Sequence, residues 1–418
     1  MSRILNARLV DGRVVDIEVT EGRIASVTTC GPASPNGAEQ AGDTVDVGGW
    51  LLLAAPAEPH AHLDKALTAE MAPNPTGDLA GAIDAWIAAA EAGLFTHDDM
   101  VIRVRAALDR LLLNGVTAVR SHVNCGSGSG ISHLIAAQEA VGPYRDLMHI
   151  EFVALTHSPM TGADGAVNRA ALRAALEAGV DLVGGCPHLE PDGPGSIEVA
   201  LDAAADAGVP VDLHVDETLD PSMLMLRDLA RAVSGRGFEG RVAASHCVSL
   251  GMQTPKVQAS VAAEVAAAGI AVIPLPQTNL YLQGRHHPTG SPRGLTAIGP
   301  LRDAGVIVAA GGDNVQDPFN LVGRSDPLET AALMVMAGHL LPEAAYDAVS
   351  NDVRRVMGLA PVRFEIGDTA DFLAIDAPSV RGAIADAPAD RMTFRAGRLV
   401  ASTATTRSIH RRSREGLA

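Results

Sequence analysis

Continuous hydrophobic runs, broken at intervals by polar and turn residues, dominate the middle of the chain. Such runs are typical of parallel strands that are buried on both faces of their sheet. Eight runs of this kind follow one another between residues 51 and 311. We expect the strands at 51–61, 117–123, 148–156, 181–186, 210–215, 241–246, 271–276 and 306–311.

Segments with helical hydrophobic spacing separate these runs. Eight alternating strand–helix units predict an α/β fold with a closed (β/α)8 TIM barrel. An open doubly wound sheet is the alternative, but no Gly-x-Gly-x-x-Gly pattern follows the first strand, which weakens it. The expected helices are 79–92, 98–114, 131–140, 167–178, 195–207, 221–234, 256–268 and 294–304, with three more at 326–340, 342–349 and 351–358.

Short β-like runs separated by turn residues occupy both ends of the chain. They predict a small β-sandwich domain that is built from both termini, residues 1–50 and 362–405. The catalytic barrel, residues 51–361, is then inserted between the two halves of this domain. The terminal runs lie at 4–10, 14–19, 24–27, 372–375, 392–395 and 399–401.

The composition narrows the possible partners and the compartment. The 418 residues are 47% hydrophobic, which suits a globular core, and they carry a formal net charge of −17. This charge argues against binding to nucleic acid or to an anionic membrane surface, and no apolar run is long enough to span a bilayer. Four cysteines are too few for a disulfide framework. We therefore expect a cytoplasmic protein.

Histidines and an aspartate stand at the ends of the expected strands. His60 and His62 close the first strand, and residues two apart in a strand face the same side. His214, His246 and Asp313 end the fifth, sixth and eighth strands. Active sites of TIM barrels lie at the carboxyl ends of the strands, and imidazole is a common ligand of transition metals. The sequence therefore predicts a metal site at the mouth of the barrel.

The residues around these positions resemble the amidohydrolase superfamily, and within it cytosine deaminase and its relatives. The His/His/Glu/His/Asp set is specific for the superfamily, and the stretch from Asn279 to Arg285 is specific for the branch. The matching pieces span the whole barrel and are Glu58-Pro59-His60-Ala61-His62-Leu63-Asp64, Arg120-Ser121-His122-Val123, His214-Val215-Asp216-Glu217, Ser245-His246, Asn279-Leu280-Tyr281-Leu282-Gln283-Gly284-Arg285, and Asp313-Asn314 with Asp317-Pro318.

This resemblance implies one divalent metal ion, zinc or ferrous iron. No lysine ends the fourth strand, so a pair of metals bridged by a carboxylated lysine is not expected. The implied ligands are His60, His62, His214 and Asp313.

The resemblance also implies a reaction. A hydroxide formed at the metal attacks the ring carbon that bears the amino group, and Asp313 accepts a proton as the hydroxide forms. Glu217 protonates a ring nitrogen and then passes the proton to the leaving amine. His246 stabilises the tetrahedral intermediate.

Two positions in the expected substrate pocket depart from the branch. His157 stands where cytosine deaminases carry a glutamine, and an imidazole does not reproduce the donor and acceptor of a primary amide. Asn314 replaces the acid that usually follows the metal-binding aspartate. Gln283 and His122 are further candidates for substrate contact, each weighed against a structural role. Lys65 is interpreted as a solvated lysine rather than a contact for an anionic substrate.

Three functions are compatible with these residues. The first is hydrolytic deamination of a small heterocycle: a cytosine-like, isoguanine, triazine, pterin or creatinine-like ring. The second is ring opening of a cyclic amide by the same metal site. The third, a catalytically silent scaffold, is disfavoured because the whole set of ligands and catalytic residues is present. The superfamily also implies a homo-oligomer.

Overall fold

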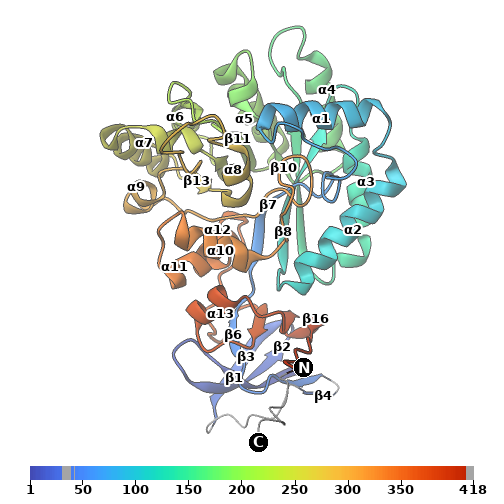
Figure 1. Cartoon of the computed structure of the whole chain (residues 1–418), viewed down its shortest axis with the longest axis vertical. Helices are drawn as coiled ribbons and strands as arrows, with labels where there is room; N and C mark the ends of the chain where they lie inside the picture. The colour runs from blue at the N-terminus through green and yellow to red at the C-terminus, as the bar shows by residue number, and fades with distance from the viewer. Residues whose placement is uncertain (31–38, 42, 411–418) are drawn as a thin grey trace, which may run out of the picture.

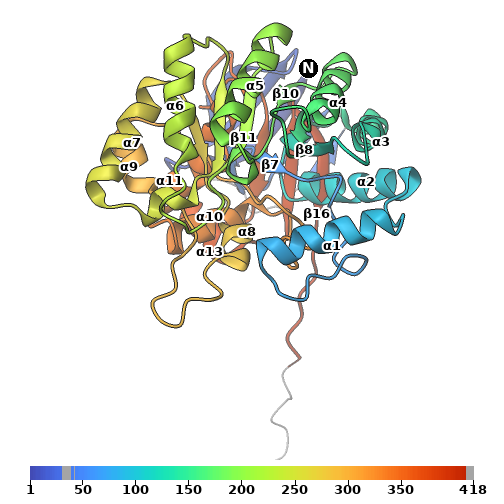
Figure 2. The ribbon, with the colours of Figure 1, turned by 90° about the horizontal axis from the view of Figure 1, so that it is seen from above.

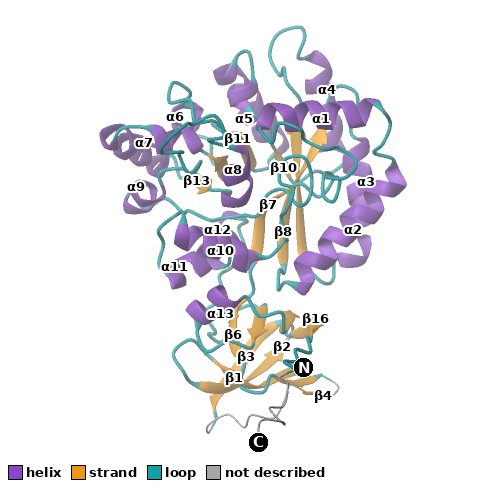
Figure 3. Cartoon of the chain, in the orientation of Figure 1, coloured by secondary structure: helices purple, strands orange, loops and turns teal. Residues whose placement is uncertain are grey.

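The computed structural model describes residues 1–30, 39–41 and 43–410. A β-sheet contributed by both ends of the chain forms the lower part of the molecule in Figure 1. Parallel strands surrounded by helices form the upper part (Figure 3). No described helix combines the length and the apolar character that crossing a bilayer requires.

The upper part is a nearly closed parallel barrel. Its seven strands pair in chain order, which confirms the expected α/β class and the TIM-like arrangement. They are β7 (Ala57–Ala61), β8 (Ala118–Cys125), β9 (His149–Thr156), β10 (Leu182–Val183), β11 (Val211–Val215), β12 (Val242–His246) and β13 (Ala271–Ile273).

The eighth expected strand, 306–311, does not form a ladder. Val308 makes an isolated parallel bridge to Val272, and Asp313 makes another to Ala61. Between these two bridges the backbone N–H of Ala310 donates to the carbonyl of Ala348 instead of a neighbouring strand. The segment therefore closes the ring between β13 and β7 through single bridges.

Helices cover the outside of the barrel (Figure 2). Two of them, α8 and α13, were not expected from the hydrophobic pattern, and α9 is much shorter than its expected range of 294–304. The helices are α1 (Leu79–Glu91), α2 (His97–Leu113), α3 (Ser132–Ala140), α4 (Ala166–Glu177), α5 (Gly193–Ala207), α6 (Met225–Arg236), α7 (Pro255–Ala267), α8 (Pro276–Leu282), α9 (Ile298–Asp303), α10 (Pro327–Met336), α11 (Pro342–Ala348), α12 (Asn351–Val356) and α13 (Val380–Asp386), with 3-10 turns η1 (Gly142–Tyr144), η2 (Pro187–Leu189) and η3 (Val248–Met252).

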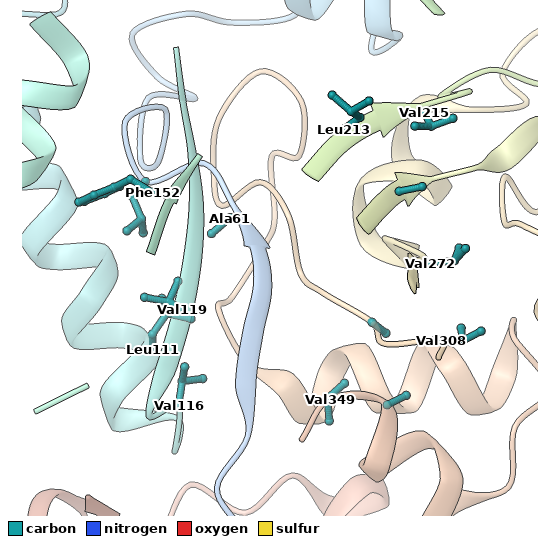
Figure 4. Close-up of a cluster of buried hydrophobic side chains, with 14 of the residues drawn as sticks. Ala61, Leu111, Val116, Val119, Phe152, Leu213, Val215, Val272, Val308 and Val349 are labelled. Atoms are coloured by element: carbon teal, nitrogen blue, oxygen red, sulfur yellow. The ribbon is translucent and has the colours of Figure 1, made fainter. Parts of the chain in front are cut away.

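The core between strands and helices is made mostly of Val, Leu, Ala and Ile side chains. Figure 4 shows Val119 beside Leu111 of α2, with Phe152 of the neighbouring strand farther up the same layer. Small branched side chains suit this layer because they fill the narrow space between a sheet and its helices at high packing density.

The strands from both termini join in one nine-stranded sheet. The expected strand 51–61 was wrong as a single element, because β6 pairs antiparallel with β14 in this sheet whereas β7 enters the barrel. Pro56, which has no backbone N–H to donate, lies between them. The division into two domains and the sandwich packing stay predictions. The strands are β1 (Ser2–Arg8), β2 (Val14–Thr20), β3 (Arg23–Thr29), β4 (Glu39–Ala41), β5 (Thr44–Asp46), β6 (Leu51–Ala54), β14 (Phe372–Ile375), β15 (Arg391–Arg395) and β16 (Arg398–Thr403).

Candidate active site

Four residues converge at the carboxyl ends of β7 and β11 and of the eighth segment. The Nε2 atom of His214 lies 3.1 Å from the Nε2 atoms of both His60 and His62. An Oδ1 atom of Asp313 lies 3.2 Å from Nε2 of His62 and 3.6 Å from Nε2 of His60. The structure thus brings together the four side chains that the resemblance implied as metal ligands.

This cluster can hold a divalent metal ion. Ligand atoms about 2.0–2.1 Å from a tetrahedral zinc lie roughly 3.3 Å from one another, which is the spacing of these nitrogen and oxygen atoms. Asp313 is 2% exposed, and neither of its carboxylate oxygens has a hydrogen-bond partner among the described residues. A buried carboxylate without donors requires a cation.

The imidazoles of the cluster are held in their neutral form. Burial lowers the pKa of His60 and His214 well below the ordinary value, and the neighbouring imidazoles lower it further. Burial and Lys65 lower the pKa of His62 as well. A neutral imidazole keeps a lone pair for a metal, whereas a protonated one cannot bind it.

The backbone turns sharply where the site residues leave their strands. Asp216, His246 and Asp313 have φ angles of +52°, +68° and +62°, in the left-handed region that residues other than glycine rarely adopt. Such strain clusters at functional sites, where it aims side chains that a regular strand would direct elsewhere. Here it directs the ends of β11, β12 and the eighth segment into the barrel mouth.

A buried chain of polar side chains supports His60 from below. Nδ1 of His60 lies 2.8 Å from the hydroxyl of Ser245, which donates to Asp212 at 3.0 Å. Arg120 donates to Asp212 at 2.8 Å and to Glu151 at 2.9 Å. The second nitrogen of a metal-binding histidine usually has such a partner, which fixes the orientation of the ring.

Glu58 links the first strand to the eighth segment beneath the ligands. Its carboxyl group accepts from the backbone N–H of His60 at 3.1 Å and of Gly312 at 2.9 Å. Burial raises the pKa of Glu58 to about 8, although both hydrogen bonds oppose this.

Glu217 and His246 face the cluster from β11 and β12. Burial raises the pKa of Glu217 well above its ordinary value, and the charge of Asp313 adds to this effect. His246 lies with Nδ1 3.0 Å from Oδ1 of Asn279, and its Nε2 has no partner among the described residues. The site thus holds a buried carboxyl group with a raised pKa beside an imidazole whose Nε2 has no partner within the described structure.

A cavity of about 870 Å³ opens over the cluster. His62, His214, Glu217, His246 and Asp313 line its base. Helix α1 supplies an apolar wall, to which Phe95 adds a ring stacked on Trp86 at 4.1 Å between centroids. The wall residues of α1 are Leu79, Ile83, Trp86, Ile87 and Ala90.

The four residues suggested for substrate contact fall into two groups. His157 and Asn314 line the cavity. His157 places Nδ1 3.0 Å from the carbonyl of Ser127, and Asn314 donates to Asp317 at 2.7 Å.

Gln283 and His122 are not among the residues that line the cavity. Gln283 donates at 3.1 Å to the backbone carbonyl of Glu217. His122 is fully buried, with its ring 3.9 Å from that of His60. The structure therefore favours supporting positions for both, and the roles of all four stay predictions.

The interpretation of Lys65 as a solvated lysine was wrong. Lys65 is 4% exposed and lines the cavity. Its ammonium lies 3.1 Å from Nδ1 of His62 and donates to Asn124 at 2.9 Å. Sequence reasoning did not consider Asn124 or Trp86 at all. The sequence around them gives little indication of a role, because they reach the site only through the packing of β8 and α1 beside β7.

Comparisons with known proteins agree with this geometry. A sequence profile described as the amidohydrolase family matches residues 96–401. A pterin deaminase of Rhizobium rhizogenes is 32% identical over 391 residues, which cover 92% of this chain and 87% of that protein.

Solved structures are similar over nearly the whole chain. A 5-methylcytosine deaminase from Klebsiella pneumoniae, liganded with 5-fluorocytosine, has a TM-score of 0.87 at 26% identity, with 98% of this chain and 99% of the other covered. An N-isopropylammelide isopropylaminohydrolase from Burkholderia multivorans has a TM-score of 0.79 at 25% identity, with 96% and 99% covered.

These matches confirm the family resemblance inferred from the strand-end residues, and with it a hydrolytic enzyme that acts on C–N bonds. The chain therefore belongs to the amidohydrolase family, in its cytosine deaminase-like branch.

Proposed function

We propose that this enzyme hydrolytically removes an amino group from a small aromatic nitrogen heterocycle. The observation that carries the proposal is the buried His60, His62, His214 and Asp313 cluster with the buried carboxyl group of Glu217 beside it, at the base of one cavity. The relatives named for deaminase activity support the same chemistry.

We assign one divalent metal ion, zinc or ferrous iron, to His60, His62, His214 and Asp313. When bound, it supplies Lewis acidity and lowers the pKa of water toward neutrality. Asp313, whose carboxylate oxygens have no hydrogen-bond partner within the described structure, would accept a proton from the water that attacks the ring. Nδ1 of His246 donates to Oδ1 of Asn279, so the neutral ring keeps a lone pair on Nε2, and this nitrogen would accept a hydrogen bond from the hydroxyl group that adds to the ring carbon.

Glu217 supplies the proton that the leaving group needs. Burial raises the pKa of Glu217 and so favours its protonated form, which would donate to a ring nitrogen next to the amino-bearing carbon. The carboxylate then takes the proton of the hydroxyl group that has added to the ring carbon and delivers it to the departing amine. The proton held by Asp313 returns to Glu217 and restores the starting state. Gln283 holds the backbone carbonyl of Glu217 and so fixes where this proton is offered.

We infer that the heterocycle is a fused two-ring system of pterin size. A cavity of about 870 Å³ is large for a single pyrimidine ring. The apolar wall of α1 with Trp86 offers a flat surface on which an extended ring can stack. The 32% identity to a pterin deaminase favours the same substrate class. The homo-oligomeric state and the cytoplasmic location stay predictions.

Ammonia release tests the proposal directly. Purified protein loaded with zinc or ferrous iron is assayed against pterins, aminopurines, aminopyrimidines and aminotriazines. We expect release from one ring class, and a decrease in kcat of about 10²- to 10⁴-fold in Glu217→Gln with metal content unchanged. Glu239→Gln, an exposed carboxylate in the loop after α6, is the matched control. Absence of ammonia from every ring at one metal per chain would contradict deamination and favour ring opening of a cyclic amide.

A further inference from the structure

The chain has only two lysines, Lys65 and Lys256. Lys256 is exposed near the start of α7, whereas Lys65 is nine-tenths buried in the wall of the cavity. Burying an ammonium group is costly unless partners replace its hydration. The buried position of Lys65 therefore indicates which chemical groups a ligand of the cavity carries.

The described partners leave part of the ammonium group of Lys65 unused. An ammonium has three N–H donors, and two of them face Nδ1 of His62 and Oδ1 of Asn124. The nearest carboxylate oxygen, Oδ1 of Asp64, is 3.9 Å away, beyond hydrogen-bond reach. One N–H remains for a ligand.

The contact with His62 is available only while Nδ1 carries no hydrogen. A neutral imidazole that offers Nε2 to a metal keeps its hydrogen on Nδ1 and does not accept from Lys65. Two of the three N–H groups of Lys65 are then free for a molecule in the cavity.

Asn124 adds a second donor at the same place. Its Oδ1 accepts from Lys65 and its backbone N–H donates to Asp64. Its side-chain NH2 donates to no described residue, and Asn124 also lines the cavity. Lys65 and Asn124 therefore present N–H groups side by side, with no acceptor of their own left between them.

The surroundings suit a flat ring with an oxygen on its edge. The ammonium of Lys65 lies 5.6 Å from the centroid of the Trp86 ring, which belongs to the apolar wall. Of the Asp64 carboxylate, Oδ2 accepts from His133 at 2.9 Å and from the backbone of Asn124 at 3.1 Å, whereas Oδ1 has no hydrogen-bond partner among the described residues and lies 3.9 Å from the ammonium of Lys65. Glu91 and Glu190 are the other carboxylates of the lining apart from the catalytic pair, and Glu190 accepts from Met160.

We propose that Lys65 and Asn124 bind an oxygen substituent of the substrate, a ring oxo group or a carboxylate. The substituent lies on the His62 side of the cavity, whereas the amino-bearing carbon faces Glu217 on the His246 side. An oxygen substituent is favoured because it can accept hydrogen bonds from Lys65 and Asn124. An amino group at this place would direct its own N–H groups at theirs. This inference rests on the proposed function, because it places the ring at the same metal site.

Matched substrates and a charge-removing variant test the subsite. The readout is the ratio of kcat/KM for 2-amino-4-oxopteridine to that for 2,4-diaminopteridine, in which an amino group replaces the oxo group. We expect Lys65→Met to lower this ratio by about 10- to 100-fold, mainly through KM for the oxo substrate, with one metal per chain retained. Asn124→Leu should lower it in the same direction, and Lys256→Met should leave it unchanged.

A pterin that carries a ring carboxylate distinguishes the two oxygen groups. If Lys65→Met lowers kcat/KM more for this compound than for the oxo ring alone, the carboxylate is the group bound. If Lys65→Met lowers kcat/KM equally for the substrate with the oxo group alone, the oxo group is the one that Lys65 binds. An unchanged ratio together with loss of metal in Lys65→Met would overturn the proposal and leave Lys65 as a support for His62.

Binding of an unreactive ring separates this inference from the proposed function. Pteridine-2,4-dione has no amino group to lose, so its dissociation constant is measured by calorimetry on the metal-loaded wild type and on Lys65→Met. Suppose that no ring releases ammonia but the dione binds about 10- to 100-fold more weakly to Lys65→Met than to the wild type. The proposed deamination is then contradicted, whereas the proposed oxygen subsite is supported. Equal binding to both proteins would reject the subsite.

Discussion

A buried aspartate beside the terminal sheet and one at the mouth of the barrel show how a structural charge differs from a functional one. Asp371 precedes β14 and is 0% exposed, yet Arg354, Arg395 and the backbone of Ala396 all donate to its carboxylate. Asp313 is buried just as deeply, and neither of its oxygens has a donor among the described residues.

The difference concerns where the compensating positive charge comes from. The chain supplies two arginines for Asp371, so this carboxylate is neutralised as soon as the protein folds. For Asp313 the nearest groups are neutral imidazoles, so its charge is balanced only when a cation arrives from solution. A buried acid without donors is therefore a better sign of a metal site than a buried acid alone.

Replacing Asp313 should have the largest effect on metal binding. We expect Asp313→Asn to weaken binding of zinc by more than about 100-fold, because a charged ligand is lost. The free energy of unfolding of the metal-free protein should not fall, since the variant removes an unpaired buried charge. Metal titration and urea unfolding measure the two quantities. A variant that unfolds more easily without metal would show that Asp313 has a partner within the chain.

Replacing Asp371 should have the opposite pattern. Asp371→Asn leaves the buried Arg354 without its charged partner, and we expect the free energy of unfolding to decrease by about 3–5 kcal/mol. Metal affinity per folded chain should be unchanged. Urea unfolding and metal analysis on the same preparation are the measurements. If metal affinity fell together with stability, the region around Asp371 and the metal site would not be independent.

Glu58 extends the comparison to a third buried carboxyl group, whose effect on stability depends on pH. Its pKa is raised in the folded protein from 4.5 to about 8, so the folded state holds a proton that the unfolded state releases. Stability of the metal-free protein is therefore highest below pH 4.5 and is lost as pH rises from 4.5 through 8, by a few kcal/mol. Glu58→Gln should flatten this slope in urea unfolding between pH 5 and 8. An identical slope in both proteins would mean that Glu58 does not titrate in this range.

The smallest effect is expected below the cluster, at Ser245. Ser245→Ala removes the hydroxyl that faces Nδ1 of His60, and we expect metal affinity to fall by about 10- to 100-fold with little change in stability. Competition with a chromogenic chelator measures the affinity. Ser234→Ala, at an exposed position of α6, is the control. Unchanged affinity would indicate that packing alone orients His60.

Much of the fold could be predicted because the barrel strands are continuous apolar runs whose meaning does not depend on their partners. The wrong strand predictions lie where the hydrogen-bonding partner of a run, and not its hydrophobicity, determines the structure. Nothing in the run 51–61 except Pro56 shows that its first half pairs with β14. The run 306–311 looks like its neighbours, but the N–H of Ala310 bonds to Ala348.

The part of the site that could be predicted consists of the side chains at the carboxyl ends of the barrel strands. Histidines and an aspartate at these places predicted a cluster, and the cluster is present. Lys65 was misjudged because lysine is rarely buried, and its partners Asn124 and Trp86 lie about 60 and 20 residues farther along the chain. For His122 and Gln283 the sequence left substrate contact and a structural role open, and the structure favours supporting positions, because neither lines the cavity.

The weak closure of the barrel between β7 and the eighth segment has a consequence for the topology of the chain. One isolated backbone bridge, Ala61 to Asp313, and the hydrogen bond from Gly312 to the side chain of Glu58 join these two segments near the mouth. A metal ion held by His60, His62 and Asp313 would tie together positions about 250 residues apart in sequence. It would act on the unfolded ensemble as a cross-link that closes a very long loop. Release of the ion would then open a seam that runs the length of the barrel, and amide hydrogens along this seam would exchange first.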